Sequence, residues 1–320
     1  MIVDSRFQPW PPLRNAHLQT LFASQLRPRP VLSPQRERVE LPDGDFVDVD
    51  WLGPGNGPVV VVLHGLTGSI RSKYVRGLMK ELAAHGWRAA LMHFRGASGE
   101  ANRLARSYHS GDTGDVDFFL RRLAGQEPNT PVALVGYSLG GNVALKWLGE
   151  QGDGAPVAAA VAVSVPFDLA CAARRMQTGL SRLYQRHLLQ GMRTEMRRKH
   201  ATLPPPIRCQ ALRRFASIEA FDNAVTAPLN GFRDAADYYR RASCRAYIAS
   251  IRRPTLILHA LDDPFMFPAA VPRAEELPPA VTLELSRHGG HVGFIGGRGL
   301  RPVYWLEQRI PAFLRAQIGR

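Results

Sequence analysis

Cysteine is scarce in this sequence. Its 320 residues contain only Cys171, Cys209 and Cys244, and no Cys-x-x-Cys pair. An odd number of widely separated cysteines argues against a disulfide framework and a zinc-thiolate site, and it fits a reducing compartment. His-Glu-x-x-His and other clustered metal-binding patterns are also missing from the sequence. We therefore expect no bound metal and no disulfide scaffold.

Long hydrophobic runs are missing too. The longest, residues 59–63 and 156–165, are shorter than the roughly 20 apolar residues that a membrane-spanning helix needs. The first six residues, Met1–Arg6, contain no apolar stretch of the kind found in secretory signals. From these two absences we expect a cytoplasmic protein.

The glycine-rich stretches do not form a nucleotide-binding loop. Residues 136–141 lack the Gly-x-Gly-x-x-Gly spacing of a dinucleotide site, and residues 289–299 lack the Lys-Ser/Thr ending of a phosphate loop. We therefore expect the protein to work without a cofactor.

Acidic residues are outnumbered: 41 Lys and Arg stand against 27 Asp and Glu, for a formal charge of +14. Residues 166–253 alone hold 17 basic and 6 acidic residues, an excess of 17 − 6 = 11. An arginine-rich, lysine-poor sequence is typical of a generally basic proteome, whereas charge concentrated in one segment favours an anionic surface or substrate. Both interpretations stay open. Contact with an anionic membrane is one alternative, and we expect no nucleic-acid partner.

The most informative stretch is residues 131–142, Pro-Val-Ala-Leu-Val-Gly-Tyr-Ser-Leu-Gly-Gly-Asn. An apolar run of strand length leads into Gly136-Tyr137-Ser138-Leu139-Gly140, and a helical pattern follows. A serine flanked in this way sits on a sharp strand-to-helix turn, where glycines avoid the clashes that Cβ atoms would cause. This context predicts that Ser138 is a catalytic nucleophile.

Strand and helix patterns alternate over residues 59–165 and again after residue 254, which predicts a mostly parallel sheet of about eight strands flanked by helices. Polar and apolar residues alternate on either side of residues 42–45, which predicts a β-hairpin before this core. Residues 166–253 contain only helical patterns and a Pro204-Pro205-Pro206 break. We therefore divide the chain into an N-terminal extension (1–58), an α/β core (59–165 and 254–320) and a helical cap insertion (166–253).

A serine needs a base to accept its proton and an acid to orient that base, and both follow late strands in this sequence. Asp262 and Asp263 come after the strand 255–259, and His288 and His291 come after the strand 281–285. Asp263 is our preferred acid because it lies four residues past the strand and is followed by a proline. Asp262 remains an alternative. His291 is our preferred base because glycines flank it and allow close approach to the serine, with His288 as the weaker alternative.

Acyl transfer also requires backbone N–H groups that stabilise a negatively charged oxygen. Leu139 directly follows the nucleophile at a helix N-terminus, so its N–H is one expected donor. The loop after the strand 59–63 begins His64-Gly65-Leu66, and the N–H of Leu66 is the second.

These features resemble the α/β-hydrolase superfamily and, within it, its YheT-type branch. The resemblance rests on the nucleophile turn and on six further motifs that together extend from residue 15 to residue 294. They are Asn-Ala-His-Leu-Gln-Thr (15–20), His-Gly-Leu-Thr-Gly-Ser (64–69), Phe-Arg-Gly-Ala-Ser-Gly-Glu (94–100), Tyr-His-Ser-Gly (108–111), Asp-Asp-Pro (262–264) and Gly-Gly-His-Val-Gly-Phe (289–294). The resemblance implies a carboxylesterase-like serine hydrolase with Ser138, Asp263 and His291 as its triad. It also implies relatives that act on phospholipids or transfer medium-chain acyl groups to alcohols.

Three functions remain open. The first is hydrolysis of carboxylic esters, with short- to medium-chain and lipid-derived acyl groups as expected substrates. The second is acyl transfer to an alcohol, or phospholipase-type hydrolysis, by the same triad. The third is a non-catalytic module that binds lipid or nucleic acid through the basic insertion, which the complete triad disfavours.

Overall fold

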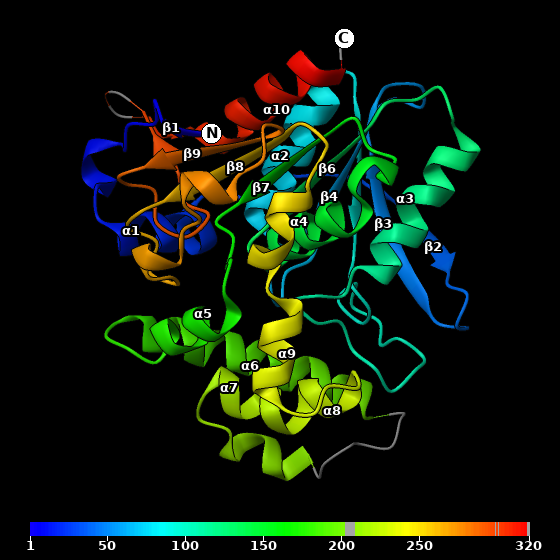
Figure 1. Cartoon of the computed structure of the whole chain (residues 1–320), viewed down its shortest axis with the longest axis vertical. Helices are drawn as coiled ribbons and strands as arrows, with labels where there is room; N and C mark the ends of the chain where they lie inside the picture. Colours follow the sequence, from blue (N-terminus) through cyan, green and yellow to red (C-terminus); the bar gives the residue numbers. More distant parts are fainter. Residues whose placement is uncertain (202–208, 298, 300, 319–320) are drawn as a thin grey trace.

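A mixed sheet of nine strands forms the centre of this computed structural model, which describes residues 1–201, 209–297, 299 and 301–318 (Figure 1). The strands are β1 (Ile2–Asp4), β2 (Gln35–Glu40), β3 (Phe46–Leu52), β4 (Val59–Leu63), β5 (Arg88–Met92), β6 (Val132–Tyr137), β7 (Ala159–Val163), β8 (Thr255–Ala260) and β9 (Val281–Ser286). Their order across the sheet is β1-β9-β8-β7-β6-β4-β5-β3-β2. A separate two-stranded sheet pairs β10 (Ile295–Gly296) with β11 (Val303–Tyr304).

The sheet is parallel except at one edge. β3 runs antiparallel to β5, and β2 pairs with β3 as an antiparallel hairpin, which confirms the hairpin expected from the sequence. The sheet has one strand more than the roughly eight that the sequence predicts. One strand that the sequence pattern did not reveal is β1, which has three residues and lies parallel to β9. A segment this short carries no readable period, and its pairing partner is some 280 residues away along the chain.

Helices cover both faces of the sheet. The helices are α1 (Ala16–Leu21), α2 (Lys73–Ala84), α3 (Gly114–Gln126), α4 (Leu139–Gln151), α5 (Leu169–Met176), α6 (Ser181–Lys199), α7 (Ile218–Phe221), α8 (Ala227–Leu229), α9 (Ala235–Ala242) and α10 (Trp305–Ile318). Apolar side chains of α2 and α10 pack on one face, and those of α3 and α4 pack on the other. Successive residues of β4 therefore point into two different cores, which is why this strand reads as a continuous apolar run.

In the described part of the segment between β7 and β8, all the regular secondary structure is helical. In Figure 1 the helices α5 to α9 lie together, apart from the sheet and its covering helices. This segment folds as several separate helices: α5 ends at Met176, for example, and α6 begins at Ser181. Residues 202–208, including the predicted Pro204-Pro205-Pro206 break, lie outside the described residues. The division into extension, core and cap stays a prediction, and we refer to residues 166–253 as the proposed cap.

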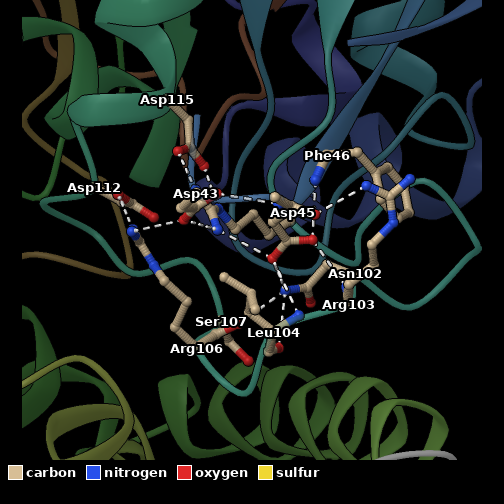
Figure 2. Close-up of polar contacts among 12 residues, drawn as sticks. Asp43, Asp45, Phe46, Asn102, Arg103, Leu104, Arg106, Ser107, Asp112 and Asp115 are labelled. Atoms are coloured by element: carbon tan, nitrogen blue, oxygen red, sulfur yellow. Dashed lines mark hydrogen bonds and ion pairs between the residues drawn. The ribbon is translucent and has the colours of Figure 1, made fainter. Parts of the chain in front are cut away.

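A buried ion cluster fixes the loop that follows β5 (Figure 2). Arg95 forms a bidentate pair with Asp115, at 2.6 and 2.7 Å, and it also donates to Asp43 and Asp45. The Asn102 amide donates to the same Asp45 carboxylate at 2.6 Å. Burying a charge is costly unless it is paired and hydrogen-bonded, and these contacts meet that condition. Arg95, the first residue of the Arg-Gly-x-Ser-Gly motif at residues 95–99, therefore has a structural role, because it holds the loop after β5 in place.

Candidate active site

Ser138 lies on a strained turn between β6 and α4. Its backbone has φ 51° and ψ −117°, a region that L-residues rarely adopt and that is often found at functional sites. The turn is possible only because the flanking residues are glycines. A Cβ on Gly136 would lie 2.3 Å from the carbonyl oxygen of Gly140, and a Cβ on Gly140 would lie 2.5 Å from that of Leu63.

Two hydrogen bonds connect Ser138, His291 and Asp263. His291 Nε2 lies 3.0 Å from Ser138 Oγ, and His291 Nδ1 lies 2.8 Å from Asp263 Oδ2. Asp263 is buried, and its other oxygen accepts the backbone N–H of Phe265 at 2.8 Å. The Phe265 ring stacks on the imidazole at 3.8 Å between centroids. The structure thus brings the three residues that the sequence favours together in one chain of hydrogen bonds.

The two alternative residues lie apart from this chain of hydrogen bonds. Asp262 Oδ1 accepts the backbone N–H of Gly290 at 2.9 Å and so holds the turn that precedes His291. The His288 imidazole is about half exposed and lies 3.5 Å from the Asp262 carboxylate. Neither side chain forms a hydrogen bond with Ser138 Oγ, whose bonding partner is His291.

The two expected oxyanion donors, Leu66 and Leu139, both border the cavity next to Ser138. The Ser138 carbonyl accepts the N–H of Asn142 at 3.0 Å, inside the first turn of α4. Carbonyl and N–H point in opposite directions across a trans peptide, so the Leu139 N–H is directed out of the helix end. Neither Leu66 N–H nor Leu139 N–H donates to an atom of the described residues.

A neutral histidine sets the orientation of the Leu66 N–H. Burial and the neighbouring His93 lower the pKa of His64 to about 3, so its ring carries one proton near neutral pH. Nδ1 donates to the Gly65 carbonyl at 2.7 Å, and Nε2 accepts the Phe94 N–H at 3.3 Å. Because this holds the Gly65 carbonyl on one side of the peptide, the Leu66 N–H points to the other. Nothing in the sequence pattern indicated this structural role of His64.

Comparison with known proteins gives the family. A family model for the alpha/beta hydrolase fold matches residues 58–297. The chain belongs to the α/β hydrolase fold family. Its sequence is 46% identical to that of YheT of Escherichia coli (strain K12), a protein named as an esterase. The match covers 97% of this chain and 93% of the relative.

Two more distant similarities agree with this assignment. The α/β-hydrolase chain is 26% identical to a mouse protein named phospholipase ABHD3, over 94% of its own length and 76% of the relative's. A solved esterase of Pyrococcus furiosus matches with a TM-score of 0.60 and 18% identity, covering 91% of this chain and 97% of that one. This second likeness shows the fold alone.

A cavity of about 790 Å³ opens beside Ser138 in this α/β-hydrolase. Its walls come from the N-terminal segment, the loops after the strands and the proposed cap. Many of its lining side chains are apolar, among them Leu169, Ala173, Met176, Leu188 and Met192. A volume of this size is typical of a pocket for a small organic ligand. Among the described residues, no three His, Cys, Asp or Glu side chains are grouped as metal ligands would be.

The N-terminal segment contributes a support that sequence reasoning missed. Gln19 is fully buried, and its amide forms three hydrogen bonds, one to Leu13 and two to the backbone of Ile295 just beyond the histidine loop. The Thr20 hydroxyl accepts the backbone N–H of His291 at 2.9 Å. The motif at residues 15–20 was the available signal, because it places two polar residues inside a short amphipathic helix. Its contact with His291 becomes visible only in three dimensions.

The Tyr-His-Ser-Gly motif connects the core to the proposed cap. The Tyr108 hydroxyl accepts the Thr67 N–H at 3.0 Å and donates to the Glu195 carboxylate of α6 at 3.3 Å. The Ser110 N–H donates to the Tyr238 hydroxyl of α9 at 2.8 Å, and the Ser110 carbonyl accepts the Asn142 amide at 2.7 Å. The motif therefore fixes the loop that carries Leu66 and the position of α9.

Cys171 and Cys244 are free thiols, whereas the side chain of Cys209 lies outside the described residues. Within the part of the chain that the structure describes, no helix is both long enough and apolar enough to cross a bilayer.

Proposed function

We propose that this α/β-hydrolase cleaves carboxylic esters through an acyl-enzyme formed on Ser138. The observation that carries the proposal is the pair of hydrogen bonds from Ser138 Oγ through His291 to Asp263, at 3.0 and 2.8 Å. An activated serine beside two unused backbone donors is the arrangement that acyl transfer requires. Asp263 serves as the orienting acid, and Leu66 and Leu139 serve as the oxyanion donors.

The reaction proceeds in two halves. His291 Nε2 takes the proton of Ser138 Oγ as the oxygen attacks the ester carbonyl, and the N–H groups of Leu66 and Leu139 stabilise the resulting oxyanion. The intermediate collapses, and the alcohol leaves with the proton from His291. Water then attacks the acyl-enzyme by the same path in reverse, which releases the acid and regenerates Ser138. Asp263 holds the imidazole in the required tautomer and stabilises its positive charge.

We propose short- to medium-chain acyl esters, including lipid-derived ones, as the substrates. The apolar walls of the 790 Å³ cavity support an acyl chain as the bound group. Relatives named esterase and phospholipase support the same class of compound. Lipid is accordingly the proposed partner of the basic segment, in preference to nucleic acid, with peripheral contact at an anionic membrane.

Covalent labelling tests the nucleophile. Wild-type protein, Ser138→Ala and the exposed-serine control Ser250→Ala are treated with a fluorophosphonate and assayed with p-nitrophenyl esters. We expect labelling and a burst of p-nitrophenol from wild type and from Ser250→Ala, and neither from Ser138→Ala. Equal labelling of wild type and Ser138→Ala would show that Ser138 is not the nucleophile.

A chain-length series tests the substrate and the alternative reaction. Esters from acetyl to palmitoyl report the depth of the acyl pocket, and we expect kcat/KM to peak at short to medium length. Adding an alcohol to the same assay separates hydrolysis from acyl transfer, because a transferase diverts the acyl group to the new ester. Predominant ester formation at low alcohol concentration would favour acyl transfer.

A further inference from the structure

Exposed leucines gather around the opening of the cavity. Five of the exposed large apolar side chains belong to two neighbouring parts of the chain, α1 with its continuation η2 (Phe22–Leu26) and the start of α6. We call these five the leucine rim: Leu18, Leu21, Leu26, Leu180 and Leu183, which are 42–70% exposed. Leu21, Leu180 and Leu183 also line the cavity. The rim therefore continues the apolar wall of the site out to the molecular surface.

The two halves of the leucine rim are held side by side. His17 of α1 and Tyr184 of α6 stack with an angle of 12° between their rings, and His17 Nδ1 lies 3.1 Å from the Tyr184 hydroxyl. Tyr184 packs in turn against Phe265, the ring that stacks on His291. The rim thus has a fixed position relative to the histidine of the triad.

The segments that carry these leucines also carry exposed positive charge. Exposed arginines lie beside them in sequence, Arg14 and Arg29 flanking α1 and η2, and Arg182 and Arg186 on α6. None of the four forms an ion pair with a carboxylate of the described residues. Arg71 and Lys73 line the cavity as well, whereas the lining carboxylate, Asp222, is buried and bonded to Thr226 and Tyr239. The opening is therefore apolar and cationic at once.

We propose that the leucine rim docks this protein on the surface of an anionic lipid bilayer, with the cavity opening facing the lipid. The inference rests on the proposed function, and it names the surface from which that site takes its substrate. Leucines that project among arginines suit a lipid interface, where apolar side chains enter the acyl boundary and guanidinium groups meet anionic headgroups. A second copy of this chain fits less well, because a two-fold contact would set the same arginines against each other.

Vesicle co-sedimentation tests the docking surface without turnover. The Ser138→Ala protein is mixed with phosphatidylcholine vesicles that contain or lack phosphatidylglycerol. We expect binding that requires phosphatidylglycerol and weakens with salt. Adding Leu18→Ser and Leu26→Ser together should lower the partition coefficient by at least about tenfold, from the lost apolar burial. Arg182→Gln with Arg186→Gln should lower it by roughly 10- to 30-fold, from two lost charges near the surface. The matched control, Leu104→Ser, removes an exposed leucine elsewhere and should bind like its parent.

The outcomes separate this inference from the proposed function. Leu18 and Leu26 do not line the cavity, so otherwise wild-type protein with these two changes should hydrolyse a dispersed, water-soluble ester at the wild-type rate. If active wild-type protein binds no vesicle, or if the leucine changes leave binding unaltered, the docking surface is wrong while the esterase stands. Vesicle binding by a protein that fluorophosphonate does not label would refute the esterase alone. A dimer in solution that the leucine changes dissociate would identify the rim as a contact between copies and overturn the inference.

Discussion

The hydroxyl of Thr20 gives the sharpest test of how the N-terminal segment supports catalysis. Thr20 is 5% exposed, donates to the Ala16 carbonyl at 2.9 Å and accepts the His291 N–H at 2.9 Å. Thr20→Val keeps the volume and removes the acceptor, so the His291 N–H loses its partner. Leaving a buried donor unpaired costs about 1–3 kcal/mol. If this cost falls on the loop conformation in which His291 faces Ser138, kcat should fall by roughly 5- to 150-fold, since about 1.4 kcal/mol corresponds to a factor of ten.

The assay is steady-state hydrolysis of a p-nitrophenyl ester, with thermal melting of each variant alongside. KM should change little, because Thr20 acts through the base. Thr20→Ser keeps a hydroxyl and should restore most of kcat. Thr130→Val, which removes a hydroxyl bonded to Glu127, is the control for an ordinary threonine change and should leave kcat unaltered. A Thr20→Val enzyme with wild-type kcat, or a Thr20→Ser enzyme as slow as Thr20→Val, would refute the reasoning.

Three further predictions follow from the site. Asp263→Asn should lower kcat by roughly 10⁴-fold because it favours the wrong tautomer of the base. Asp262→Asn keeps an acceptor for the loop N–H and should lower kcat by less than about tenfold. Similar losses of kcat in the two variants would contradict the assignment of Asp263 as the acid. Gly136→Ala places a Cβ 2.3 Å from a backbone oxygen and should lower the melting temperature or prevent folding. The control, Gly125→Ala, places a Cβ with no atom within 4 Å and should stabilise its helix by up to about 1 kcal/mol. Melting curves of the two variants compare these effects. Burial lowers the pKa of His64 to about 3, so its ring should show the NMR shifts of neutral imidazole between pH 8 and pH 4.5. Its contribution to the stability of the fold should be lost as the pH falls from about 6.5 towards 3, because the unfolded chain binds that proton first. A ring that titrates near pH 6.5 would contradict this.

The core strands and the turn at Ser138 follow from local pattern. The fully apolar run 59–63 is β4, and the predicted strand before Ser138 is β6, because a strand buried on both faces must be apolar at every position. The glycines at 136 and 140 are required by contacts within a few residues or with the adjacent strand. Such constraints are visible in sequence because they involve short stretches of neighbouring chain.

The exposed positions of Leu180 and Leu183 were not predictable in the same way. The sequence predicts only that they belong to a helical insertion, whereas in the structure the chain turns at residues 177–180 and both side chains lie partly exposed at the edge of the cavity. The spacing of apolar residues shows that a segment forms a helix with an apolar side. Which part of the protein that side faces depends on the path of the chain in the folded structure. The same limit applied to β1, whose partner lies at the other end of the sequence.

The sequence by itself determined which groups are available for catalysis. These are a serine on a sharp turn, two acids and two histidines after late strands, and two loops with candidate backbone donors. Tertiary structure alone decided which of these meet. It joined Asp263 and not Asp262 to His291, used neutral His64 to turn the Leu66 N–H, and brought Thr20 against a histidine 271 residues away. The physical reason is the distance along the chain over which each interaction acts. Backbone propensity and glycine sterics act over a few residues, whereas a hydrogen bond between distant loops depends on the folded sheet that holds both ends in place.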